Sequence, residues 1–158
     1  MKAKEGIVDF LNQVLTNELT AINQYFVHAE MCDHWGYARL YNKIRAHSME
    51  EMKDAEEIIE HILYLEGVPN MQRLGQIQVG ETVPEQLKLD LRLEQEAVAL
   101  LTEAIAHCAK AGDYTTRHKL EKMVEREEGH IDWIETQLET IKQVGVDNYL
   151  SQQIHKEE

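Results

Sequence analysis

The chain has 158 residues, of which 43 % are apolar and 28 % charged, and this length and composition suit one globular domain, residues 1–158. Two prolines and eight glycines are too few for a collagen-like chain or a Gly/Pro-rich disordered one. The 29 acidic residues outnumber the 16 basic ones and give a net charge of −13, which argues against nucleic acid as a partner.

The N-terminal residues indicate a cytoplasmic protein. The stretch MKAKEGIVDF contains acidic residues and no apolar run of signal-peptide length. No run elsewhere approaches the ~18 apolar residues of a membrane span, so we expect no membrane partner. Cys32 and Cys108 have neither CxxC nor zinc-finger spacing, and we expect both to be unpaired thiols without a functional role.

Four long segments have the apolar periodicity and the residue composition of α-helices. Short links join the first segment to the second and the third to the fourth, so each pair should form an antiparallel hairpin. The pattern therefore predicts an all-α fold. The four segments cover roughly residues 5–34, 38–66, 83–111 and 114–144.

The remaining segments complete the predicted topology. Residues 67–81 contain three glycines and a proline, and an extended stretch of that length can reach ~50 Å, enough to cross a helix ~40 Å long. Thr82 is a predicted N-cap, and residues 147–155 are predicted to form a short fifth helix after Gly145. The sequence therefore predicts a four-helix bundle made of two antiparallel hairpins joined by one long crossover.

The two predicted hairpins repeat each other along the chain. Glu94 follows Glu18 by 76 residues (94 − 18), and Glu127 follows Glu51 by the same number (127 − 51). The apolar residues of the inward-facing stripes, spaced three and four apart, repeat at the same displacement. The chain is therefore a duplicated helical hairpin with one acid on the inner face of each helix.

These four glutamates are expected to converge inside the bundle. Burying a carboxylate costs several kcal/mol unless it is protonated or binds a cation. Two divalent cations would balance four carboxylates, and oxygen ligands suit iron or manganese. His130 lies three residues after Glu127 on the same helix face, and its imidazole improves the fit for iron. We therefore predict a dinuclear metal site, with a polar layer without metal as the alternative.

Five stretches of the chain resemble bacterioferritins, the haem-containing branch of the ferritin family. The resemblance runs almost from end to end, and it implies a ferritin-like four-helix bundle. The stretches are NELTAINQYF (17–26), HSMEEM (47–52), ILYLEGVPN (62–70), EEGHIDWIETQL (127–138) and NYL (148–150).

The resemblance implies a subunit of a hollow shell of 24 copies that stores iron as a ferric mineral. Such shells oxidise Fe(II) with oxygen or peroxide, so the chain would be a ferroxidase, and a ferredoxin-type protein would be its electron donor. By position, Glu51 and Glu127 would bridge two irons. The other ligands would be Glu18 with residue 54 on one iron and Glu94 with His130 on the other.

Asp54 is the departure from the family pattern, which has histidine at this position. An aspartate still offers an oxygen ligand, but a fifth carboxylate leaves two Fe(II) with a net charge of −1 and favours the ferric state. Alternatively, Asp54 hangs free and one iron is weakly bound. Two functions follow: a working ferroxidase, or a haem-carrying structural subunit with an impaired site, working in a mixed shell with a sister subunit.

Met52 is the predicted haem ligand. It directly follows Glu51, so it lies ~100° around the helix and points away from the metal site. The family resemblance places it on a two-fold interface, where two copies would bind one haem b through their sulfurs. Interface packing is the alternative for an outward methionine.

Two aromatic residues and two other enzyme classes complete the alternatives. Tyr25 and Trp133 could donate an electron to an oxidising metal centre, although core packing also explains both. A rubrerythrin-like peroxidase would need a CxxC iron module, which the sequence lacks. A di-iron hydroxylase would need a substrate cavity that a sequence does not reveal.

Overall fold

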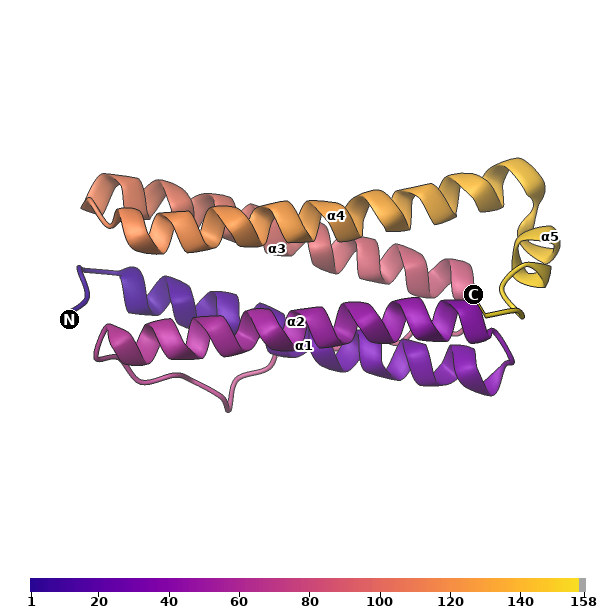
Figure 1. Ribbon diagram of the computed structural model, residues 1–158, viewed down its shortest axis with the longest axis horizontal. Helices are drawn as coiled ribbons and strands as arrows, with labels where there is room; N and C mark the ends of the chain where they lie inside the picture. Colours follow the sequence, from indigo (N-terminus) through magenta and orange to yellow (C-terminus); the bar gives the residue numbers. More distant parts are fainter. Residues whose placement is uncertain (157–158) are drawn as a thin grey trace.

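The computed structural model describes residues 1–156, and its four long helices match the predicted segments (Figure 1). A short fifth helix follows the fourth. The described residues include no strand, so the all-α prediction is confirmed. The helices are α1 (Ile7–His34), α2 (Ala38–Tyr64), α3 (Val83–Ala111), α4 (Tyr114–Val144) and α5 (Val146–Ser151).

Local sequence signals set the starts of α3 and α4. Thr82 caps α3 as predicted, because its Oγ1 accepts a hydrogen bond from the backbone N–H of Glu85 at 3.3 Å. Asp113 caps α4 in the same way and accepts from the backbone N–H of Thr116 at 3.0 Å. Gly112, with φ at 77°, allows the tight turn between the two helices. The second hairpin is therefore defined by its own cap and turn residues.

The fifth helix is shorter than predicted, since it ends at Ser151 rather than near residue 155. Beyond it, the backbone carbonyl of Gln153 accepts a hydrogen bond from the backbone N–H of Arg39 at 3.0 Å. This N–H lies in the first turn of α2, where backbone N–H groups take partners from outside the helix. This contact holds the backbone beyond α5 against the start of α2.

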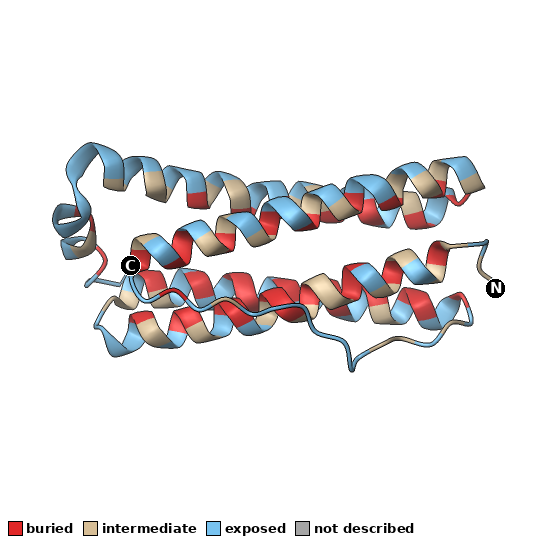
Figure 2. Cartoon of the chain, turned by 180° about the vertical axis from the view of Figure 1, so that it is seen from behind, coloured by how far each residue is buried: buried red, intermediate tan, exposed pale blue. Residues whose placement is uncertain are grey.

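The two hairpins, α1 with α2 and α3 with α4, lie side by side with α5 at one end of the bundle (Figure 1). Buried residues form a stripe along the inner face of each long helix (Figure 2). No helix within residues 1–156 is both long and apolar enough to span a membrane.

The apolar core is divided into two clusters with a polar layer between them. Leu11 and Leu120 belong to the cluster at the end where α1 begins. Tyr25 and Ile44 belong to the cluster nearer α5. This division leaves the centre of the bundle to buried acids and histidine, and each flanking cluster excludes water from them.

The crossover runs along α1 (Figure 2). Polar side chains of α1 fix its path. Four backbone N–H groups of the crossover donate hydrogen bonds to this face, so the long connection is ordered by its donors rather than by a core of its own. The sequence alone did not predict this contact. The pairs are Asn70 to Oδ1 of Asn12 (2.8 Å), Gly75 to Oγ1 of Thr20 (2.8 Å), Gln78 to Oε1 of Gln24 (3.1 Å) and Gly80 to Nε2 of His28 (2.9 Å).

Candidate metal centre

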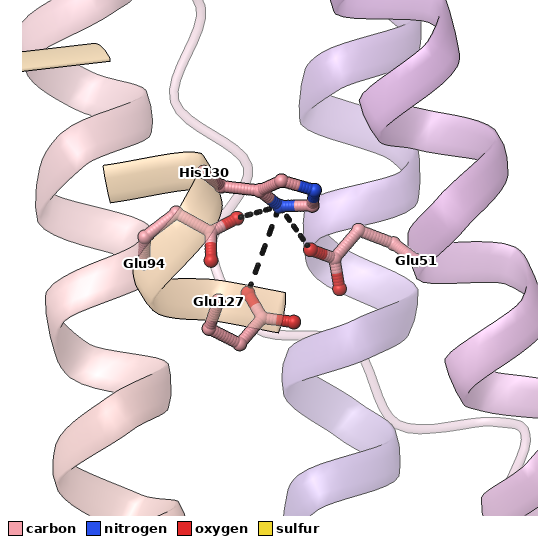
Figure 3. A group of neighbouring side chains, drawn as sticks. All are labelled: Glu51, Glu94, Glu127 and His130. Carbon is pink, nitrogen blue, oxygen red and sulfur yellow. Dashed lines mark ion pairs between the residues drawn. The ribbon is translucent and has the colours of Figure 1, made fainter. Parts of the chain in front are cut away.

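Six buried side chains from the four long helices meet in the polar layer, and they are the six residues predicted as metal ligands. None is more than 4 % exposed. They form two overlapping groups, in each of which the ligand-capable atoms lie within 4.8 Å of one another. Figure 3 shows the first group. The groups are Glu51, Glu94, Glu127 and His130, and Glu18, Glu51, Asp54 and Glu127.

The duplication of the hairpin explains this arrangement. On α4, Glu127 and His130 are three residues apart and therefore share one helix face. On α2, Glu51 and Asp54 have the same spacing. The first helix of each hairpin adds one glutamate, so each hairpin brings an equivalent set of three side chains to the centre.

Each of the six side chains leaves a buried polar atom without a hydrogen-bond partner. An unpartnered buried donor or acceptor costs ~1–3 kcal/mol. The unpartnered atoms are carboxylate oxygens and one imidazole nitrogen, which are the donors that iron and manganese accept. The residues present therefore fit a metal centre. The atoms are Oε2 of Glu18, Oε1 of Glu51, Oδ2 of Asp54, Oε2 of Glu94, Oε1 of Glu127 and Nδ1 of His130.

Burial and mutual repulsion favour protons on this cluster. Burial, together with the charge of Glu51, raises the pKa of Glu94 to about 8. The same two causes raise the pKa of Glu18 well above its usual range. Burial alone would lower the pKa of His130, but its contacts with the carboxylates of Glu51 and Glu94 outweigh this effect and raise it to about 11. Divalent cations entering the cluster would therefore displace protons.

His130 presents Nδ1 to the cluster and Nε2 to the opposite side. Its Nδ1 lies 3.1 Å from Oε1 of Glu51 and 3.6 Å from Oε1 of Glu94 (Figure 3). Its Nε2 lies 2.5 Å from Oε2 of Glu50, a half-exposed residue. His47 stacks on the ring, with the two centroids 4.1 Å apart. Because both the outer nitrogen and the ring plane are in contact with neighbours, Nδ1 points into the cluster in a fixed direction.

Asp54 is bound on one side and unpartnered on the other. Its Oδ1 forms an ion pair with the guanidinium of Arg126 at 2.6 Å, and Arg126 also contacts Glu57 at 3.2 Å. Its Oδ2 is buried with no hydrogen-bond partner. Burial raises the pKa of Asp54 to about 6, although Arg126 acts to lower it. The carboxylate of Asp54 therefore has a counter-charge that sequence reasoning did not include. Both alternatives for Asp54, as an iron ligand or as a residue that leaves one iron weakly bound, stay predictions.

Sequence analysis assigned no contact with the centre to Glu50 or Arg126, the two residues that reach it from outside. Each directly precedes one of the shared glutamates, Glu51 and Glu127, and the repeat relates them (126 − 50 = 76). The signal was therefore present in the duplication. It was overlooked because the two residues have opposite charges, and an internal repeat is usually recognised from similar side chains.

The remaining predicted residues lie as follows. Met52 is 47 % exposed, whereas the adjacent Glu51 is 1 % exposed, so Met52 faces away from the centre. The hydroxyl of Tyr25 donates a hydrogen bond to Oε1 of Glu94 at 2.5 Å. Trp133 packs edge-on against His47, with centroids 5.1 Å apart. Cys32 and Cys108 are both buried and unpaired.

The helical bundle and its buried cluster of acids and histidine define a ferritin-like protein, and the family model of the ferritin-like domain matches residues 8–144. Several curated relatives carry the name bacterioferritin. The one from Mycobacterium bovis is 44 % identical over 152 residues, which cover 96 % of each chain. Those from Rhodobacter capsulatus and Brucella melitensis are 42 % and 39 % identical, covering 92 % and 94 % of this chain and 90 % and 92 % of theirs. The chain therefore belongs to the bacterioferritin family, which confirms the resemblance inferred from its sequence.

Proposed function

We propose that residues 1–158 form one ferritin-like subunit that stores iron in the cytoplasm and oxidises Fe(II) at a di-iron centre. The observation that supports this most strongly is the set of unpartnered buried oxygens in two overlapping groups. Two cations that share Glu51 and Glu127 would satisfy both groups at once. A polar layer without metal would pair Nδ1 of His130 with Oε1 of Glu51 but would leave the buried oxygens of Glu18, Asp54, Glu94 and Glu127 without partners, which native cores rarely tolerate.

Each side chain has a defined part in this proposal. When bound there, Fe(II) would supply the electrons that reduce oxygen or peroxide. Tyr25 orients Glu94 through its hydroxyl, and Glu50 orients His130 through Nε2. Since the pKa of Glu94 lies near 8, iron entry is coupled to proton release near neutral pH. The ligands would be Glu51 and Glu127 as bridges, Glu18 and Asp54 at one position, and Glu94 and His130 at the other.

We further propose that 24 copies assemble into a closed shell around a ferric mineral. Large apolar side chains exposed on α1 and α2 support burial against other copies, because obligate subunit interfaces are apolar. Two copies would share one haem b through Met52 of each, and a ferredoxin-type protein would deliver electrons. The exposed side chains include Phe26, Met49, Met52, Leu63 and Tyr64.

A second candidate function is a haem-carrying structural subunit in a mixed shell with a sister chain. The observation that favours it is the ion pair between Asp54 and Arg126, which engages one carboxylate oxygen at a position where the family has a histidine. In that case the shell would depend on the sister chain for rapid iron oxidation.

Stopped-flow absorbance separates the two candidates. Anaerobic protein loaded with two Fe(II) per subunit is mixed with oxygenated buffer, and a working ferroxidase should give a fast oxidation phase. Glu127→Gln should slow that phase, whereas Glu121→Gln, which removes an exposed acid from the same helix, should not. A slow, unchanged rate in all three proteins would favour the second candidate and contradict the ferroxidase proposal.

The haem and shell proposals are tested with a second pair of variants. Met52→Leu conserves size and apolar character but removes the sulfur, so the bis-thioether haem spectrum should disappear while the particle sediments as before. Met49→Leu is the matched control, because Met49 is on the same helix and equally exposed at 46 %. Full haem binding by Met52→Leu would contradict haem ligation, and a stable monomer at micromolar concentration would contradict the shell.

A further inference from the structure

The metal centre is flanked by two contacts that occupy equivalent positions in the duplicated hairpins. Glu50 on α2 contacts His130 on α4, and Arg126 on α4 contacts Asp54 on α2. Both members of the first pair are related to the second by the repeat, since 126 − 50 and 130 − 54 both equal 76. The two contacts therefore occupy equivalent places, but one pairs an outer acid with an inner histidine and the other pairs an outer arginine with an inner acid.

In both contacts one atom of the inner residue is bound on the outside and another points into the cluster. His130 pairs through Nε2 with Glu50, and its Nδ1 faces the cluster, 3.1 Å from Oε1 of Glu51. Asp54 pairs through Oδ1 with Arg126, and its Oδ2 has no hydrogen-bond partner. An outer partner of this kind is how proteins orient a metal ligand.

Charge explains why positions 54 and 126 both differ from their equivalents in the repeat, 130 and 50. Asp54 adds a fifth carboxylate to the cluster, and two divalent cations balance only four. Arg126 supplies the missing positive charge from a site that is 36 % exposed, where its other neighbour is Glu57. An acid at position 126 would repel Asp54, while a histidine at position 54 would find no acceptor in a guanidinium, which only donates.

We propose that Arg126 is a positioning residue that orients Asp54 as a one-oxygen metal ligand and neutralises its charge. The ion pair thereby replaces the acid–histidine pair of the other half. The centre then has two unequal positions, one with an imidazole nitrogen and one with oxygen ligands alone. This inference rests on the proposed di-iron function. It runs against the impaired-subunit alternative, in which Arg126 withdraws Asp54 from the metal.

Anaerobic titration with Co(II), followed by calorimetry and visible absorption, tests the inference without relying on iron oxidation. The wild-type protein should bind two Co(II) per subunit at the centre. Arg126→Gln should weaken one of them by at least about tenfold, the usual loss when an outer partner of a ligand is removed, and leave the other unchanged. Arg117→Gln is the matched control, because it removes an arginine from the exposed ion pair with Glu121 on the same helix.

An exchange of both residues sharpens the test. Asp54→His alone should weaken the binding of the Co(II) on the Asp54 side of the centre, because Arg126 cannot accept a hydrogen bond from the new imidazole. The double variant Asp54→His/Arg126→Glu reproduces the chemistry of the other half and should recover two tight sites. Equal affinity of the single and double variants, or tighter binding by Arg126→Gln, would overturn the inference, the latter result showing that Arg126 competes with metal for Asp54.

A further variant distinguishes failure of this inference from failure of the proposed function. Glu51→Gln/Glu127→Gln removes both shared glutamates and defines the background of cobalt bound elsewhere on the acidic protein. If wild-type binding does not exceed that background, both the function and the inference fall. If wild-type binding does exceed it and Arg126→Gln has no effect, only the role of Arg126 falls.

Discussion

Asp90 and Glu94 lie one turn apart on α3 and are equally buried, at 1 % exposed each, yet their surroundings differ. Oδ1 of Asp90 accepts a hydrogen bond from Nε2 of Gln24 at 3.0 Å and lies 2.9 Å from Nδ1 of His28. Glu94 has one oxygen bound to the hydroxyl of Tyr25 and the other without a partner. One acid is part of a closed network, and the other is left with free coordination capacity.

The network around Asp90 also determines the state of its histidine. The backbone N–H of Gly80 donates to Nε2 of His28, so this nitrogen accepts and the ring proton is on Nδ1, where it faces Asp90. The network thereby connects α1, α3 and the crossover. Burial of an acid therefore does not by itself indicate a metal site. The indication is that several converging side chains have buried atoms without hydrogen-bond partners.

The largest expected effect is a loss of Co(II) affinity when Glu94, but not Asp90, is replaced. Glu94→Gln should reduce Co(II) affinity by about 100-fold or more, since loss of a ligand exceeds the 10–100-fold loss seen for outer partners. The metal-free protein should unfold at the same or a higher denaturant concentration above pH 8, because the variant removes a carboxylate that burial disfavours. Calorimetry and urea unfolding measure the two quantities. Lower stability with unchanged Co(II) affinity would show that Glu94 is a structural acid and not a metal ligand.

Asp90→Ala should produce the opposite pattern. It leaves His28 and Gln24 without their buried acceptor, and breaking such a contact costs ~3 kcal/mol of unfolding free energy. Co(II) affinity should stay within twofold of the wild type, because Asp90 contributes no atom to either ligand group. Asp90→Asn keeps one acceptor oxygen and should lose less than half as much stability. Equal losses in the two variants would show that packing, rather than the hydrogen bonds, is responsible.

The helices and the six cluster residues were predictable because they depend on short-range periodicity and on the repeat. Glu18 and Glu94 repeat at a fixed displacement on apolar stripes, and helical geometry converts that spacing into a shared inner face. Thr82 was predictable as a cap for the same reason, since its partner Glu85 is only three residues away. Local rules suffice where the partners are close in sequence.

Contacts between distant segments were not predictable in this way. The path of the crossover depends on Thr20 and His28 meeting backbone donors more than fifty residues away, at Gly75 and Gly80. The ion pair of Arg126 with Asp54 likewise joins different hairpins. A polar residue on a helix face could contact many different segments until the neighbouring segment is placed, so periodicity alone cannot identify its partner.

The pH dependence of stability should differ between metal-free and metal-bound protein. In the folded chain the pKa of Glu94 is raised from about 4.5 to about 8. Its stabilising contribution is therefore complete below pH 4.5 and is lost as pH rises through 8. The raised pKa of His130 acts in the same direction above pH 6.5. The lowered pKa of His47 acts oppositely, but only below pH 6.5.

Between pH 6.5 and 8.5 the metal-free protein should thus lose several degrees in Tm, recorded by circular dichroism with a chelator present. Co(II) competes with the same protons, so the increase in Tm that it causes should grow over this interval. In Glu94→Gln the metal-free slope should become shallower. A metal-free Tm that rises with pH would contradict the assignment of shared protons to this cluster.

The smallest expected effect concerns the edge of the hydrogen-bonded region, where the crossover meets α1. Oγ1 of Thr20 accepts from the backbone N–H of Gly75 at 2.8 Å and donates to the carbonyl of Thr16 at 2.7 Å. Thr20→Val replaces the hydroxyl with a methyl group, and we expect a loss of ~1 kcal/mol because Gly75 is exposed and water can partly replace the lost acceptor. Thr102→Val is the matched control, since its hydroxyl bonds only within its own exposed helix face. Hydrogen exchange at the Gly75 amide should accelerate in the first variant alone; equal exchange rates in both variants would show that Thr20 does not anchor the crossover.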